Sequence, residues 1–290
     1  MSAVWKLHQQ ARLRLLGLTG RFLGGEGRAG AKRSLYESLR AGWAWRHFAM
    51  ELAFHRTVTR YRTTLLGPVW IVLGFVIFSF GMVFLSSRLF GLPWERLLPY
   101  VVVGLFGWNL ILGVLSEGPR ALVESANLLQ QSQTPVVLYP IVSTIKQVLI
   151  AAHNIPVVIA VVVLTPNALS PNVAWAIPGF AAIIVFAGST CVILAIIATY
   201  IPDVAEVVTS ALRFVFFFTP IFWMADTRPG LATIWLWNPF YYFVEAFRGP
   251  VLGTSDPLQI LPVASAIAFG SAILAFILAR CMSRNTITRL

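Results

Sequence analysis

The chain has 290 residues, of which 58% are hydrophobic and 11% are charged, and its mean hydropathy is +0.77. Soluble domains average about 45–50% apolar and about 25% charged residues, so this composition excludes a soluble globular protein. The net charge of +11 is concentrated at one end, because 12 of the 22 lysines and arginines lie in residues 1–62. This placement fits the anionic cytoplasmic face of a membrane better than a nucleic-acid groove, and we expect no nucleic-acid partner.

The N-terminal region divides into two predicted parts. Residues 1–34 form a basic extension ending in a glycine-rich linker, and the first 33 residues lack the apolar core of a secretory signal. In the second part, residues 35–62, helical periodicity over 35–58 predicts an amphipathic helix that lies in the membrane interface. Its apolar stripe comprises Leu35, Tyr36, Leu39, Trp43, Met50 and Phe54, and Glu37, Arg40, Glu51 and His55 lie opposite.

Residues 63–282 are predicted to form a six-span transmembrane domain. A hydrocarbon core of about 30 Å needs about 20 apolar helical residues. Residues 147–202 carry no charge over 56 residues, and the stretch TPNALSP at 165–171 divides them into two spans. The fold class is therefore an all-α integral membrane protein, with spans near 67–87, 97–115, 138–164, 173–200, 205–224 and 257–279.

The distribution of basic residues predicts the orientation of these spans. With the N-terminus inside, the inner segments hold 16 lysines and arginines and the outer segments hold four. By the positive-inside rule both termini are cytoplasmic, including a tail at 283–290. Within the spans, Lys146 and Arg213 are expected to reach toward the cytoplasmic interface. His153 is expected to be a hydrogen-bonded packing residue, and a role in a transport pathway is the alternative.

Common catalytic and metal-binding motifs are absent from the sequence. There is no G-x-x-x-x-G-K-[ST], HExxH or GxSxG, so any ATP that drives transport must bind to another chain. Cys191 and Cys281 have neither CxxC spacing nor nearby histidines, and we expect packing thiols and no metal site. A membrane glycosyl- or acyltransferase is a weaker alternative, because the eleven acidic residues do not converge into a catalytic group. We therefore expect a protein that is not an enzyme and has no catalytic residues.

Five motifs in a fixed order resemble the type-2 ABC transporter permeases that export polysaccharides, such as O-antigen, capsular polysaccharide and teichoic acid exporters. The resemblance covers roughly residues 45–282. The motifs are RYRTTLLGPVW at 60–70, GLFGWN at 104–109, ESANLLQQSQTPVVLYP at 124–140, FFFTPIFWM at 216–224 and NPFYYFVEAFRGPVLG at 238–253.

This resemblance implies a homodimer joined to two copies of an ABC ATPase subunit in the bacterial inner membrane. It implies that ATP and Mg bind to that ATPase, that this chain binds no cofactor, and that the substrate is a glycan linked to a lipid. Membrane lipids are also expected partners. A type-2 permease for a drug or another small hydrophobic molecule would have nearly the same topology and stays open as an alternative.

Residues 117–131 resemble the short cytoplasmic element through which such permeases contact their ATPase. The segment is too polar to span a membrane and is bounded by prolines. The residues expected to couple the ATPase are Glu117, Arg120, Glu124, Leu128 and Leu129, with Leu122 beside them. An ordinary inner loop is the alternative interpretation.

Residues 225–256 combine many aromatic side chains with a charged pair. The apolar part is too short to cross a membrane. It therefore suggests a re-entrant helical hairpin between spans 5 and 6, as in the outer gate of the family. Aromatic rings offer flat apolar faces to sugar rings, and membrane-interface anchoring is the alternative for such residues. The expected substrate contacts here are Trp237, Tyr241, Tyr242, Glu245 and Arg248.

Three arginines precede the first span. Arg56, Arg60 and Arg62 lie at the predicted cytoplasmic headgroup level, where the phosphate of a lipid-linked glycan would enter. Attraction there is worth only about 1 kcal/mol per basic residue. The sequence therefore leaves two roles open for these arginines, substrate binding and topology anchoring.

Overall fold

The computed structural model describes residues 45–61, 65–131, 134–225, 230 and 232–287. The chain divides into two units, Met1–Ala44 and Trp45–Leu290, and the described residues belong to the second. The predicted extension 1–34 and the first ten residues of the predicted interface helix therefore lie outside the described residues. The fold below is that of the second unit alone.

All regular structure in the described residues is helical, as predicted for an all-α membrane protein. The helices are α3 (Arg46–Tyr61), α4 (Val69–Phe90), α5 (Trp94–Glu117), η1 (Gly118–Arg120), η2 (Val123–Ser125), α6 (Ala126–Gln131), α7 (Leu138–Ala152), α8 (Ile155–Leu164), η3 (Val173–Trp175), α9 (Ala176–Ala198), α10 (Val204–Phe218), α11 (Ala232–Leu236), α12 (Pro239–Leu252) and α13 (Pro257–Ile287). Among the residues that the structure describes, five helical stretches are long and apolar enough to cross a membrane: Val69–Phe90, Trp94–Arg120, Leu138–Leu164, Val173–Ala198 and Pro257–Arg280.

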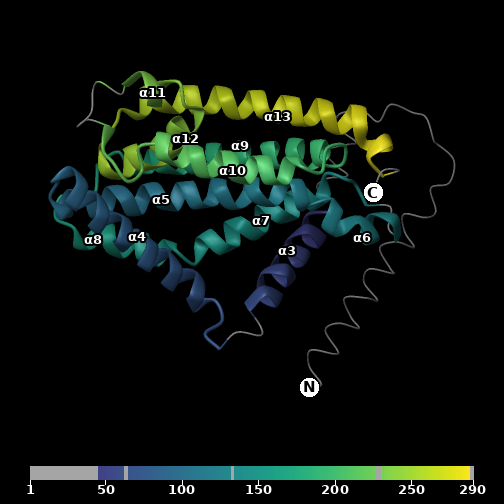
Figure 1. Ribbon diagram of the computed structural model, residues 1–290, viewed down its shortest axis with the longest axis horizontal. Coiled ribbons are helices and arrows are strands. Elements are labelled where there is room, and N and C mark those ends of the chain that lie inside the picture. The colour runs from purple at the N-terminus through teal and green to yellow at the C-terminus, as the bar shows by residue number, and fades with distance from the viewer. Residues whose placement is uncertain (1–44, 62–64, 132–133, 226–229, 231, 288–290) are drawn as a thin grey trace. The chain divides into compact units, whose positions relative to one another are not determined.

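Helix α5 lies at the centre of this unit. It packs against α4, α7, α8, α9, α10 and α12, and most of its residues are buried. Figure 1 shows it running the length of the bundle from the end that holds α11 and α12 to the end that holds α6. We call these two ends the α12 end and the α6 end. Many side chains of α4, α8 and the part of α13 up to residue 280 are exposed, as expected of lipid-facing helices.

The fifth predicted span, near 205–224, forms a shorter helix than expected. Helix α10 has 15 residues and ends at Phe218, where Thr219 has an extended backbone. The cause is Pro220, because the ring of a proline disfavours helical geometry in the residue before it. At 1.5 Å per residue α10 is about 22 Å long, which is less than the hydrocarbon core. The end predicted at 224 was wrong, and a sixth crossing of the membrane stays a prediction.

The third predicted span, 138–164, is broken in the middle. Helix α7 ends at Ala152 and α8 begins at Ile155, one residue before Pro156. Proline has no backbone N–H and clashes with the carbonyl four residues earlier, so a continuous helix is disfavoured here. The side chain of His153 bonds to the Leu149 carbonyl at 2.7 Å, in agreement with the expected packing role.

The predicted break at 165–171 forms the turn that joins α8 to η3 and α9. Asn167 has a positive φ of 57°, a conformation that asparagine tolerates better than most residues. The Ser170 N–H donates to the Val251 carbonyl at 2.8 Å. The turn is therefore tied to the C-terminal end of α12.

Helix α3 is the described part of the predicted interface helix. It packs on α7 through small side chains, since Ala49, Ala53 and Thr57 are buried. Met50 and Phe54, which belong to the predicted apolar stripe, are exposed on another face. The small residues allow a close approach to α7, and the position of this helix in the membrane interface stays a prediction.

Two short helices occupy the place of the predicted hairpin between the last two spans. Helices α11 and α12 have 5 and 14 residues, and neither is long enough to cross a membrane. Helix α12 packs against α5, α9 and α13. This contact places the predicted substrate residues of α12 beside the central helix.

Candidate functional site

The first turn of helix α12 is capped by Asn238, and this asparagine connects two of the sequence motifs. The side-chain oxygen of Asn238 accepts from the Phe240 N–H at 3.0 Å, and Pro239 takes the first helical position. The Asn238 amide donates to Thr219 Oγ1 at 2.8 Å. The start of α12 is therefore fixed to the segment that follows α10.

A buried ion pair lies on the inner face of α12. Arg248 Nε donates to Glu245 Oε2 at 2.9 Å, and the two residues are only 1% and 3% exposed. The second oxygen of Glu245 accepts a hydrogen bond from Thr254. Glu245 and Arg248, which were predicted to contact substrate, are thus paired with each other, and the arginine is covered by protein.

The guanidinium of Arg248 holds three separate segments together. Its Nη1 donates to the Pro220 carbonyl at 2.7 Å, and its Cζ lies 3.7 Å from the ring centroid of Tyr100. A side chain at Gly104 would approach Nη1 to 3.0 Å, so the missing side chain leaves space for the guanidinium. The motifs GLFGWN, FFFTPIFWM and NPFYYFVEAFRGPVLG therefore meet at one buried cation.

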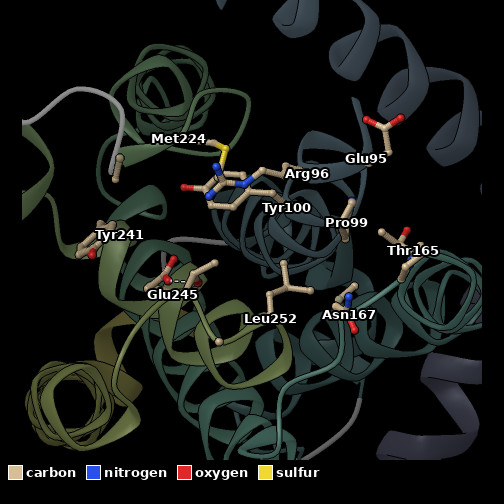
Figure 2. Close-up of a pocket in the computed structure, with 15 residues that line it drawn as sticks. Glu95, Arg96, Pro99, Tyr100, Thr165, Asn167, Met224, Tyr241, Glu245 and Leu252 are labelled. Carbon is tan, nitrogen blue, oxygen red and sulfur yellow. Dashed lines mark hydrogen bonds between the residues drawn. The ribbon is translucent and has the colours of Figure 1, made fainter. Parts of the chain in front are cut away.

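A polar cavity of about 390 Å³ opens beside this pair at the α12 end. Figure 2 shows residues from α5, the 165–171 turn, the segment after α10 and α12 around it. Among its lining residues are Glu95, Arg96, Tyr100, Asn167, Tyr241, Glu245 and Thr254. Two of the predicted substrate residues, Tyr241 and Glu245, therefore line a cavity.

The other predicted aromatic contacts have different surroundings. Trp237 is 84% exposed, and the Tyr242 hydroxyl donates to the Leu236 carbonyl at 3.1 Å. The rings of Tyr241 and Tyr242 are in edge contact, with centroids 5.3 Å apart. Partial burial and the nearby Glu245 carboxylate raise the pKa of Tyr241 to about 12. Its phenol is therefore neutral at physiological pH and can donate a hydrogen bond.

At the α6 end, the predicted coupling segment consists of η1, η2 and α6. Leu122 and Leu129 are buried in a small apolar cluster with Tyr139 and Ala195. Val123 and Leu128 are 57% and 43% exposed. The surface that a partner can reach therefore includes Leu128 and the exposed Glu124, whereas Leu129 serves the internal packing of the segment.

Two ion pairs join this segment to α7 and α10. Glu117 at the end of α5 bonds to Lys146 on α7 at 2.6 Å, and the Gln147 amide also donates to its carboxylate. Arg120 lies 3.3 Å from Glu206 on α10 at an exposed position. Glu117 was expected to couple the ATPase and Lys146 to reach toward the cytoplasmic interface, and the structure shows these two side chains partly buried against each other.

The predicted arginine cluster is only partly described. Arg56 Nη2 donates to Ser125 Oγ at 2.9 Å, which joins α3 to η2 of the coupling segment. Arg60 lies near the end of α3, but the structure does not describe its side chain. Arg62 lies outside the described residues. The structure therefore places Arg56 in a contact between the interface helix and the coupling segment.

Several partners in these sites had no direct signal in the sequence. Tyr100, the Pro220 carbonyl, Thr254 and Ser125 were all missed. Tyr100 and Pro220 are 120 residues apart in sequence, yet the Tyr100 hydroxyl donates to the Pro220 carbonyl at 3.3 Å. Within the described residues, no group of three or more histidines, cysteines or acidic residues could hold a metal ion.

Comparison with known proteins identifies the family. A family model described as ABC-2 type transporter matches residues 52–252, from within α3 to the end of α12. The chain belongs to the ABC-2 type transporter family. Two similar proteins from Klebsiella pneumoniae are both described as O-antigen export system permease protein RfbA, at 21% and 20% identity. Each match covers 65% of this chain and 74% of the relative.

Family membership establishes the general role of the chain. It is a multi-pass membrane protein and a type-2 ABC permease, which is a transport subunit without an ATPase site of its own. Such a permease works with an ABC ATPase subunit.

Proposed function

We propose that the chain exports a lipid-linked polysaccharide, such as an O-antigen, across the bacterial inner membrane. The observation that carries this proposal is the similarity to two O-antigen export permeases over 193 and 191 residues. The five motifs that resemble polysaccharide exporters support it, and three of them meet at Arg248. The active unit is a homodimer with two ATPase subunits that bind the ATP and Mg, and this chain binds no cofactor.

The proposed orientation places the α6 end in the cytoplasm, together with both termini. The excess of basic residues in the segments at that end supports it. The polar cavity and the aromatic residues of α11 and α12 then lie on the outer side. In this arrangement ATP-driven movement enters at the α6 end and the glycan leaves at the α12 end.

Tyr241, Tyr242 and Trp237 are the proposed glycan contacts. Tyr241 lines the polar cavity and Trp237 is almost fully exposed, so both can present a ring to a passing sugar. Glu245 lines the same cavity, but most of its hydrogen-bonding capacity is used by Arg248 and Thr254. Contact with an aromatic face requires no fixed hydrogen-bond pattern, which suits a polymer that slides.

Replacing Tyr241 and Tyr242 together with leucine is expected to slow glycan export about tenfold while the complex still assembles. Leucine keeps the apolar bulk but removes the flat faces and both hydroxyls. The measurement is the amount of surface glycan in a deletion strain that carries the variant, with assembly followed by co-purification of the ATPase. The double variant Tyr241→Phe and Tyr242→Phe is the matched control and should retain most export. Normal export by the leucine variant would exclude the glycan contact, and unchanged surface glycan in the deletion strain itself would exclude the proposed substrate.

The exposed face of the coupling segment is the proposed contact with the ATPase. Leu128→Asp is expected to reduce co-purification of the ATPase at least tenfold, because the contact would bury an unpaired carboxylate. Leu258→Asp is a suitable control, since Leu258 is also exposed but lies in the first turn of α13 at the α12 end. An undiminished yield of ATPase with Leu128→Asp would show that this face does not bind the partner.

A further inference from the structure

Polar side chains tie the start of the coupling segment, residues 117–125, to three different helices. The contacts are Glu117–Lys146 to α7, Arg120–Glu206 to α10 and Ser125–Arg56 to α3. A movement of the coupling segment can reach the spans through these contacts. They differ in burial and in charge, so they do not hold the three helices equally firmly.

The contact with α7 is the firmest of the three. Lys146 Nζ lies 2.6 Å from Glu117 Oε1, and the Gln147 amide donates to the same oxygen at 2.5 Å. The two charged side chains are 17% and 25% exposed, whereas those of Arg120 and Glu206 are 56% and 78% exposed. Water and salt screen an exposed pair, so the contact with α10 holds weakly. The contact with α3 is a single hydrogen bond.

Gln147 also lies against the backbone of α5. A Cβ atom at Gly113 would lie 2.5 Å from Gln147 Oε1, so the amide occupies the space of a missing side chain on α5. Gly113 precedes Glu117 by about one helical turn, and Gln147 thus contacts two successive turns of α5. This fit fixes the position of α7 along the axis of α5.

Helix α7 has a second attachment to the coupling segment. Tyr139 lies in the buried apolar cluster with Leu122 and Leu129. Apolar contact is non-directional, so by itself it would let α7 slide or pivot on the segment. Tyr139 and Lys146 are separated by about 10 Å along the helix. Two attachments at this separation prevent a pivot, and α7 must then follow the segment as one body.

The other end of α7 is able to absorb such a movement. Helix α7 ends at Ala152, and α8 begins at Ile155 after a break at His153 and Asn154. Helix α8 packs on α5 through contacts of its own. A displacement of α7 can therefore end at this break without moving α8.

We propose that Glu117 and Lys146 are positioning residues that transmit movement of the coupling segment to α7. Glu117 acts through Lys146 and does not touch the ATPase. The ion pair keeps α7 in register with the segment, and the apolar cluster keeps their surfaces together. This role rests on the ATPase contact proposed for residues 117–131, but it is independent of which substrate the transporter exports.

The double variant Glu117→Gln and Lys146→Met tests this role. It leaves no unpaired charge, and the new amide keeps an oxygen that can accept from Gln147, so the chain should fold and bind its ATPase as before. We expect the ratio of surface glycan in the deletion strain to ATPase activity of the purified complex to fall about fivefold, because the charge-assisted contact is lost.

Two further variants control for effects on packing. Exchanging the charges, Glu117→Lys with Lys146→Glu, restores an ion pair at the same two positions and should recover most of the ratio. Glu206→Gln removes a carboxylate from the exposed pair with Arg120 and should leave the ratio unchanged, because that pair holds weakly. Thermal unfolding of each variant in detergent shows whether it is folded.

Amide hydrogen exchange of the complex with its ATPase provides a measurement that needs no substrate. In the unchanged complex, ATP with vanadate should alter exchange both in residues 117–131 and at the α7–α8 break. In the double variant the response of residues 117–131 should persist, and the response at the break should be lost. If deletion of the chain leaves surface glycan unchanged, only the proposed substrate is wrong, and the exchange experiment still decides the role of the pair.

Four results would overturn the proposal. A response at the break that persists in the double variant would show that α7 follows the segment without the ion pair. Loss of ATPase co-purification from a stably folded double variant would show that Glu117 contacts the ATPase directly. Failure of the charge exchange to restore the response would show that the pair acts only through packing. No response of residues 117–131 in the unchanged complex would exclude both the ATPase contact and the role of the pair.

Discussion

Arg248→Met is expected to lower the free energy of unfolding by about 3–5 kcal/mol, because it leaves the Glu245 carboxylate buried without its partner. The guanidinium is 1% exposed and also supplies the hydrogen bond to the Pro220 carbonyl and the contact with the Tyr100 ring. One substitution thus removes the contact that joins α12, α5 and the segment after α10. Thermal unfolding of the purified chain in detergent measures the loss.

Two further variants separate charge from packing at this position. Arg248→Lys keeps the charge but lacks the planar group that bonds Glu245 and Pro220 together, so it should recover only part of the stability. Combining Arg248→Met with Glu245→Leu removes both charges and should be more stable than Arg248→Met alone. If Arg248→Met unfolds at the same temperature as the unchanged chain, the pair does not stabilise the fold.

The buried pair shows where sequence reasoning succeeded and where it stopped. The spacing of Glu245 and Arg248 on one helical face was visible, since residues three apart are neighbours on a helix. Their burial was not visible, because it depends on Tyr100 and Pro220, which are brought in by two distant segments. Charged residues in an aromatic segment were interpreted as ligands, and tertiary packing made them partners of each other.

The position of a helix could be predicted where a single local feature of the sequence determined where it begins and ends. Long uncharged stretches identified α4, α5, α9 and α13, because burial in a bilayer requires continuous apolar helices. The end of α10 was missed although Pro220 was in view, since the apolar residues around it continue to 224. Hydrophobicity predicted that this helix continues and the proline predicted that it ends, and the helix ends before the proline.

The coupling segment shows a different limit of prediction from sequence. Leu122, Leu128 and Leu129 were all candidates for a partner surface, but the structure buries the first and third. A short apolar pattern does not tell which leucines pack internally, because 3-10 turns such as η1 and η2 change the helical period. The pairing of Glu117 with Lys146 was missed for another reason, since it joins α5 to α7 across 29 positions.

Gly179 lies at a close approach between α9 and α12. A Cβ atom at this position would lie 1.9 Å from the Ala246 carbonyl oxygen, which is too short for any non-bonded contact. The obstacle is backbone of a packed helix, so it cannot move aside as a flexible side chain could. Helix α12 also carries the Glu245–Arg248 pair, and a displacement of α12 would disturb the contacts of Arg248 with Tyr100 and Pro220.

Gly179→Ala is therefore expected to destabilise the chain by about 3 kcal/mol, the upper part of the usual range for overpacked cores. Gly107→Ala is the matched control, because its Cβ would meet only the tip of Ile183 at 3.6 Å, an ordinary contact. Thermal unfolding of both variants in detergent measures the difference, and the control should stay within about 1 kcal/mol of the unchanged chain. Equal stability of the two variants would mean that α9 and α12 do not pack this closely.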